Sequence, residues 1–214
     1  MIAKVEISTI EDLSDIAICH RSAFPNSLAS KQGSRFLSKM LEWYVVSDRG
    51  TLFHIREAGK VLGYIGAIYV PEPGMIGAAS SITQYAFKEF IRSILIRPWL
   101  LFHPDVLRRV GFIVKNLSAK LGLKKEMGDL ASDVEDFESY LGLVVVGVEK
   151  DTQGKGIGAS LMNYLAILGQ KEYQVNRLLL TVSKMNEKAL KSYKSNDWTI
   201  RKDEGDHYQL VKEL

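Results

Sequence analysis

The chain is organised around the stretch Val144-Val145-Val146-Gly147-Val148-Glu149-Lys150-Asp151-Thr152-Gln153-Gly154-Lys155-Gly156-Ile157-Gly158-Ala159-Ser160-Leu161. The run 141–148 is apolar and β-branched without alternation, which predicts a strand covered on both faces. Glycines follow at 154, 156 and 158, and leucines at helical spacing then predict a helix. Glycines let the backbone approach a ligand, and the free N–H groups and dipole of a helix start favour an anion. The stretch therefore predicts a phosphate or diphosphate site.

Two nucleotide motifs are excluded by the spacing of these glycines. G-x-G-x-G differs from the dinucleotide motif G-x-G-x-x-G, and no acidic residue follows a second strand–helix unit at the required distance. No Gly-Lys-Ser/Thr closes the loop, so it is not a Walker A loop.

Composition is that of an ordinary globular domain. The 214 residues are 46% apolar and 25% charged, which is enough to bury a core in one domain, 1–214. A formal charge of +3 is too small to indicate nucleic acid, and Cys19 is the one cysteine, so no internal disulfide is expected. We find no run of about 20 apolar residues and no signal-peptide pattern, and we expect a cytoplasmic protein without a membrane span.

The periodicity predicts strands with helices between them, an α/β (α+β) fold. A helical insertion at about 74–134 separates the third strand from the fourth, and residues 88–126 hold nine Lys/Arg against three Asp/Glu. Such a basic stretch is a solvated face, a border of an anionic-substrate pocket or a membrane-surface element. The expected strands are 4–8, 51–56, 61–70, 141–148, 177–183, 198–202 and 207–211. The expected helices are 10–21, 27–46, 85–96, 105–121, 158–170 and 186–195.

Two motifs carry a family resemblance. Gln153-Gly154-Lys155-Gly156-Ile157-Gly158 matches Q/R-x-x-G-x-G/A, and residues 182–193 match V-x-x-x-N-x-x-A-x-x-x-Y with Asn186, Ala189 and Tyr193 in register. Asp197-Trp198 stands where the pattern has Gly-Phe. With both motifs in this order, the chain resembles the GCN5-related N-acetyltransferase (GNAT) superfamily.

The resemblance implies a mixed, mostly antiparallel central sheet flanked by helices, acetyl-CoA as co-substrate and no metal. It implies that backbone groups of Val146 and Val148 pair with the pantetheine arm, which Asn186 also holds. Tyr193 would protonate the departing thiolate, and Val146 N–H would hold the carbonyl oxygen. The N–H groups of the glycine loop would bind the diphosphate, with Lys155 as a charge partner; the loop residues are Gln153, Gly154, Lys155, Gly156, Ile157, Gly158 and Ala159.

The general base is open at the sequence level. Many relatives have a glutamate where this chain has Gly142, which cannot serve. Glu138 is our candidate, and Asp136, Tyr140 and His54 are alternatives. Cys19 and His20 fall on an apolar helix face and are expected to be packing residues, so direct transfer is favoured over a cysteine intermediate.

The acceptor that the resemblance implies is the amine of a small molecule. A nucleotide-linked amino sugar is the first candidate, because the segment at Phe24-Pro25 is similar to GNAT enzymes of surface-polysaccharide pathways and the insertion is basic. The alternatives are a protein or peptide N-acetyltransferase and a non-catalytic acyl-CoA-binding module. No nucleic-acid partner is expected, and the protein would be a monomer or a homodimer.

Overall fold

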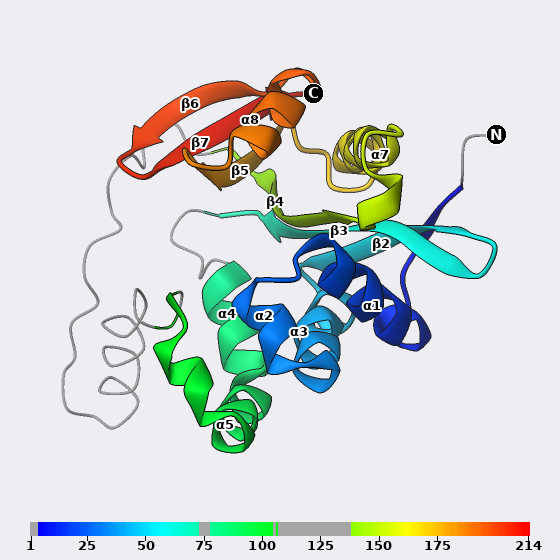
Figure 1. Ribbon diagram of the computed structural model, residues 1–214. Coiled ribbons are helices and arrows are strands. Elements are labelled where there is room, and N and C mark those ends of the chain that lie inside the picture. Colours follow the sequence, from blue (N-terminus) through cyan, green and yellow to red (C-terminus); the bar gives the residue numbers. More distant parts are fainter. Residues whose placement is uncertain (1–3, 73–77, 105, 107–137) are drawn as a thin grey trace.

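The computed structural model describes residues 4–72, 78–104, 106 and 138–214. A seven-stranded sheet runs through it in the order β1-β2-β3-β4-β5-β7-β6 (Figure 1). Every neighbouring pair is antiparallel except β4 with β5, as the sequence predicts for a mixed, mostly antiparallel sheet. The strands are β1 (Val5–Ile7), β2 (Gly50–Glu57), β3 (Lys60–Val70), β4 (Tyr140–Val148), β5 (Arg177–Ser183), β6 (Thr199–Glu204) and β7 (His207–Glu213).

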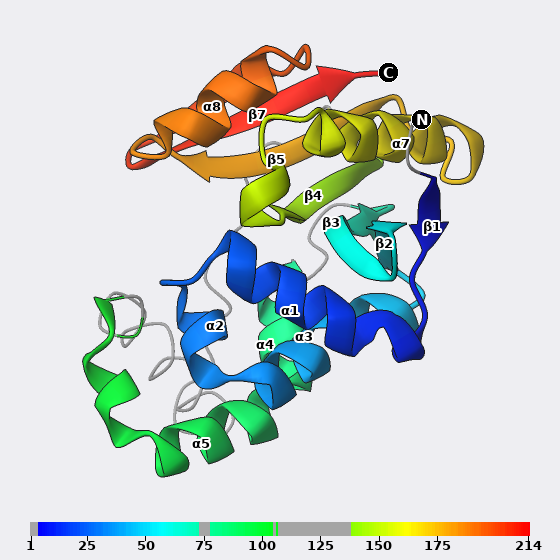
Figure 2. The same ribbon diagram turned by 45° about the vertical axis from the view of Figure 1, so that its right-hand side comes forward.

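Helices cover both faces of this sheet. On one face, α1 (Leu13–Ala23) and α3 (Ser34–Val46) bury side chains such as Ile16 and Leu41 against β2 and β3. On the other face, α7 (Ile157–Lys171) packs Leu161 and Leu165 onto β3 and β4 (Figure 2). The two apolar faces of the central strands explain why 61–70 is a nearly continuous hydrophobic run.

The expected helix 27–46 is two helices, so that prediction is wrong in one respect. Ser27 caps α2 (Leu28–Gln32) by accepting a hydrogen bond from Ser30 N, and α3 starts after Gly33. Gly33 has φ +94°, a backbone region that other residues adopt only with strain. Helical spacing continues on both sides of the glycine, so the pattern does not reveal the change of direction.

The described part of the insertion is helical, as predicted. It contains α4 (Ala78–Tyr85), α5 (Phe87–Ile96) and the 3-10 turn η2 (Pro98–Phe102). Both views place α5 on the far side of α3 from the sheet (Figures 1 and 2). The expected helix 105–121 lies outside the described residues except for Val106. None of the helices that the structure describes combines the length and the apolar character that crossing a bilayer requires.

Candidate functional site

The fourth and fifth strands pair over only part of their length. The parallel ladder consists of Leu141 with Leu178 and Gly142 with Leu179. Beyond these two pairs β5 continues to Ser183 on its other partner, β7, while β4 continues to Val148 on β3. Six residues of β4, 143–148, therefore have no ladder partner on the β5 side among the described residues.

The backbone of β4 turns the groups that do not pair with β3 toward this open edge. Glu149 N–H donates to Leu62 O at 2.8 Å, which makes that position a hydrogen-bonded pair of the antiparallel β3–β4 ladder. Because such positions alternate, the N–H and C=O groups of Val146 and Val148 point away from β3. β4 has a β-bulge at Val144, which has no partner on β3 because it lies between the pairs Gly66–Val145 and Ala67–Leu143.

The burial of β4 differs from the prediction for the same reason. Leu141 and Leu143 are buried, but Val144 is 40% exposed, and Val146 and Val148 are only half-buried. The apolar run predicted a strand covered on both faces, and this is wrong for its second half. An apolar run shows that the side chains avoid water, and it does not distinguish cover by protein from cover by a ligand.

The glycine loop ends in an uncapped helix start. Gly154 and Gly156 have φ +81° and +82°, and Gly156 is the N-cap of α7. The first helical hydrogen bond of α7 joins Ser160 N to Gly156 O, so the N–H groups of Ile157, Gly158 and Ala159 have no acceptor within the described chain. Three adjacent N–H groups and the positive end of a four-turn helix form an anion site.

Glu149 fixes the start of the loop. Its buried carboxylate pairs with Lys60 Nζ at 3.0 Å and accepts hydrogen bonds from Ser22 Oγ (3.2 Å) and Asp151 N (2.9 Å). The hydrogen bond from Lys60 is the main cause that holds the pKa of Glu149 below its usual range. The loop is thereby tied to α1 and to the β2–β3 hairpin through one carboxylate.

A hydrogen-bonded chain crosses from the loop to the last helix. Gln153 Nε2 donates to Val148 O at 3.1 Å, and Lys188 Nζ donates to Gln153 Oε1 at 2.5 Å. Lys188 lies in the first turn of α8 (Glu187–Lys194), which follows β5. The two hydrogen bonds therefore connect the two sides of the open edge. No sequence pattern indicated Lys188, because its partner depends on how far apart the two strands lie. Lys155, the cation that the sequence nominated, is exposed and has no side-chain partner among the described residues.

Asn186 is the N-cap of α8. Its Oδ1 accepts from Ala189 N at 3.2 Å, which explains the spacing N-x-x-A as a cap and its third helical residue. At the other end of α8, Asp197 has φ +65°, the left-handed conformation in which Asp is better tolerated than most residues. The aspartate in the usual glycine position thus keeps the helix end.

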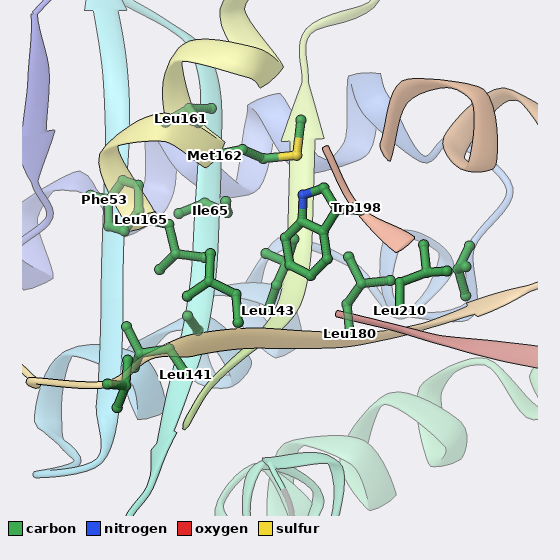
Figure 3. Packing of buried hydrophobic residues seen from close by; sticks show 14 of the residues in the cluster. Phe53, Ile65, Leu141, Leu143, Leu161, Met162, Leu165, Leu180, Trp198 and Leu210 are labelled. Atoms are coloured by element: carbon green, nitrogen blue, oxygen red, sulfur yellow. The ribbon is translucent and has the colours of Figure 1, made fainter. Parts of the chain in front are cut away.

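Tyr193 and Trp198 attach α8 to the core. Their ring centroids are 5.8 Å apart, and the buried Trp198 lies among Met162, Leu143 and Leu180 (Figure 3). Burial raises the pKa of Tyr193 to about 12, so its hydroxyl keeps its proton at neutral pH. The hydroxyl has no hydrogen-bond partner among the described residues, and it is available to a ligand.

The candidate bases lie apart from this group. Glu138 precedes β4 at the end opposite the loop and forms an ion pair with Arg177. At about 3.3 Å per residue it is roughly 20 Å along the strand from Val144. His54 is buried with Nδ1 bonded to Ser8 Oγ at 2.9 Å, two strands away from β4. Asp136 lies outside the described residues.

His20 and Cys19 are buried, as the sequence predicts for packing residues. His20 Nδ1 is hydrogen-bonded to the Tyr64 hydroxyl, and burial lowers the pKa of His20 to about 4. A Cβ at Gly147 would lie 2.4 Å from Tyr64 Cε1. The His20–Tyr64 pair therefore packs directly against β4 on the α1 face. Burial also raises the pKa of Cys19 to about 12, and its thiol is not a nucleophile at neutral pH.

The structure gathers most of the sequence-nominated residues around one open edge. Val146 and Val148 line it, the loop 153–159 lies at its end, and Asn186 and Tyr193 belong to the helix that follows the opposite strand. Their roles stay predictions. No cluster of His, Cys, Asp and Glu that could hold a metal occurs within the described ranges.

Comparison with solved structures finds the same fold at low sequence identity. PaiA N-acetyltransferase from Thermoplasma acidophilum in complex with coenzyme A superposes with a TM-score of 0.58 at 11% identity, covering 100% of both chains. An acetyltransferase from Thermus thermophilus gives 0.56 at 15%, covering 99% of this chain and 97% of that one. Arabidopsis thaliana NAA60 in complex with acetyl-CoA gives 0.57 at 14%, covering 99% and 98%.

A search of curated proteins returns no match. Residues 110–198 match the family model described as Acetyltransferase (GNAT) family, and this range contains β4, the glycine loop, β5 and α8. Over residues 110–198 the chain is thus similar to the GNAT acetyltransferases, and its fold is the one these solved acetyltransferases share.

Proposed function

We propose that the protein is an acetyl-CoA-dependent N-acetyltransferase that transfers the acetyl group directly to the amine of a small molecule. The observation that carries the proposal is the open edge of β4. Its free backbone groups lead to three unbonded N–H groups at the start of α7, and α8 brings a protonated tyrosine from the other side.

Coenzyme A fits this edge by chemistry. The N–H groups of Ile157, Gly158 and Ala159 would bind its diphosphate, with Lys155 and Lys188 as nearby cations. The amides of the pantetheine arm would pair with Val146 and Val148 as an added strand does. The similar structures from Thermoplasma acidophilum and Arabidopsis thaliana, which contain coenzyme A and acetyl-CoA, support this placement.

Gln153 would change partners when the cofactor binds. Its side chain holds the Val148 carbonyl, which the pantetheine arm needs as an acceptor. Release of that carbonyl would also free Lys188, whose ammonium group would then turn toward the diphosphate.

The transfer step needs an oxyanion donor and an acid. The amine nitrogen attacks the thioester carbonyl, the Val146 N–H stabilises the negative oxygen, and the C–S bond breaks. Tyr193 gives its proton to the leaving sulfur, so the products are an N-acetyl amide and the free thiol of coenzyme A. Cys19 takes no part, because it is buried in α1 with a raised pKa.

The proton that the amine loses has no assigned acceptor at the edge itself. Glu138, our sequence candidate, is paired with Arg177 at the far end of β4, so the proposal gives it no direct contact with the amine. If solvent accepts the proton, Glu138→Gln leaves the rate within about twofold; removal of a positioned base lowers it about 10²-fold or more.

The proposal also specifies which kind of molecule supplies the amine. The described insertion helices α4 and α5 lie against α3, where they border the α1–α3 face of the molecule. Arg92 in α5 and Arg97 directly after it add positive charge beside α3, which favours an anionic small molecule such as a nucleotide-linked amino sugar over a neutral peptide.

The test is release of the coenzyme A thiol from acetyl-CoA in the presence of single amines. The panel contains nucleotide-linked amino sugars, free amino sugars, polyamines, amino acids and peptides with free N-termini. Turnover with an amino sugar and none with peptides supports the proposal. Turnover confined to peptides would reverse the acceptor class, and tight binding of acetyl-CoA without thiol release from any amine would indicate a non-catalytic module.

A further inference from the structure

A second basic site lies away from the open edge, between α2, the start of α3 and α5. A cleft of about 160 Å³ opens there. Its walls bring together residues some 60 positions apart in the sequence, Gln32 and Arg35 from one side and Arg92 and Arg97 from the other. The cofactor contacts and the transfer step proposed above use none of these residues.

The cleft carries uncompensated positive charge. Arg35 is neutralised, because Nε and Nη2 bind the two oxygens of Glu89 at 2.8 and 3.1 Å. Arg97 donates through Nη1 to Gln32 O at 2.7 Å, and a neutral carbonyl leaves its charge in place. Arg92 is exposed and has no partner among the described residues. Three arginines against one glutamate give the cleft an excess of two positive charges.

A buried amide on the wall lacks partners. Gln32 is 3% exposed, and neither its Oε1 nor its Nε2 has a hydrogen-bond partner among the described residues. Burying an unpaired amide is unfavourable, and nearly all such groups in folded proteins are bonded to protein, water or ligand. The Gln32 side chain is therefore a group of the cleft wall whose donor and acceptor stay unsatisfied within the described chain.

The start of α3 adds free donors to the same wall. Gly33 is its N-cap and has no side chain to cap the helix, and the first hydrogen bond joins Leu37 N to Gly33 O. The N–H groups of Ser34, Arg35 and Phe36, all wall residues, therefore have no acceptor within the described chain, at the positive end of a 13-residue helix. A Cβ at Gly33 would lie 3.0 Å from Arg97 Nη1, so the glycine lets the guanidinium pack against the helix start.

We propose that this cleft binds a phosphate or diphosphate group. Helix N–H groups, arginine forks and an unpaired amide donor are the groups that recognise such anions. The volume is about half of the lower limit of ordinary ligand pockets, about 300 Å³, so the cleft fits one anionic group rather than a whole cofactor.

Two sources can supply that group. One is a soluble phosphorylated molecule, such as a nucleotide-linked acceptor. The other is a lipid, because the exposed Ile96 forms part of the wall and Leu95 and Trp99, which are 77% and 62% exposed, lie on either side of it in the sequence. Basic residues beside exposed aliphatic and tryptophan side chains suit an anionic membrane surface.

The test is calorimetric titration of inorganic pyrophosphate into protein saturated with coenzyme A, so that the glycine loop is filled. We expect saturable binding that Arg92→Gln weakens about tenfold or more. Lys88→Gln, which removes an exposed cation one turn away on the same helix, should leave it unchanged. Gln32→Leu should weaken binding without lowering the thermal midpoint, because it removes a buried unpaired amide. Pyrophosphate binding that is absent, or equal in wild type and Arg92→Gln, overturns the proposal.

Flotation with phosphatidylcholine vesicles, with and without phosphatidic acid, identifies the source. Capture by the acidic vesicles alone, lost in Arg92→Gln, assigns a lipid phosphate; pyrophosphate binding without capture assigns a soluble one. Coenzyme A titrated into Arg92→Gln should bind as in wild type. If wild type fails to bind coenzyme A yet binds pyrophosphate through Arg92, the acetyltransferase proposal fails and the anion site stands.

Discussion

Gly156 allows the cofactor contact to be separated from backbone strain. Its φ of +82° is unfavourable for any other residue, and a Cβ built there meets no protein atom within 4 Å. Gly59, in the β2–β3 turn, has φ +79° and the same open surroundings. Leucine at either position should therefore lower the free energy of unfolding by about 1–2 kcal/mol, the strain of the left-handed conformation.

The two variants should differ in coenzyme A affinity. A side chain at the N-cap of α7 would displace the diphosphate from about two of the three N–H groups, and each charge-assisted hydrogen bond contributes about 1.5–3 kcal/mol. A loss of about 3–6 kcal/mol corresponds to a dissociation constant raised about 10²- to 10⁴-fold. Calorimetry should show this for Gly156→Leu and an unchanged constant for Gly59→Leu. Equal affinity in a folded Gly156→Leu, or an equal loss in Gly59→Leu, would rule out a diphosphate contact at the start of α7.

Three further perturbations address other parts of the site. Tyr193→Phe should lower kcat about 10²- to 10⁴-fold with coenzyme A affinity unchanged; an unaltered kcat would remove the acid role. Lys188→Met should lower the affinity for coenzyme A about tenfold, measured by calorimetry at low salt. A loss of affinity that persists at high salt would argue against a charge contact. Because burial lowers the pKa of His20 to about 4, the unfolded chain binds a proton there before the folded one as pH falls. This group should therefore reduce the free energy of unfolding by about 3 kcal/mol between pH 7 and pH 4. Urea titrations of His20→Asn should show a flatter pH dependence than wild type, and identical slopes would contradict the shift.

Local patterns predicted the elements that local chemistry defines. The β4–loop–α7 unit and the helix that starts near Asn186 follow from residue types at fixed spacing, and the structure confirms both as elements. The mixed, mostly antiparallel character of the sheet followed from the family resemblance, and the order of its strands was not predicted. The break at Gly33 was missed, because the apolar period continues through it.

What the sequence could not show depends on distances across the fold. Val144 is exposed because β4 and β5 stop pairing after Gly142. The sequence of one strand does not show where the neighbouring strand diverges from it. Lys188 reaches Gln153 across that gap, and Gln32 meets Arg97 through the packing of α2 against α5. Spacing alone nominated Glu138, and only the direction of β4 shows how far it lies from the open edge.

Amide NMR of isotope-labelled protein, titrated with coenzyme A and separately with pantetheine, tests the proposed cofactor site most directly. Coenzyme A should shift and protect the amides of Ile157, Gly158 and Ala159 together with Val146. Pantetheine, which lacks the diphosphate, should affect the Val146 amide and leave the three helix-start amides unchanged. Binding of coenzyme A that leaves the three helix-start amides unchanged would contradict the account.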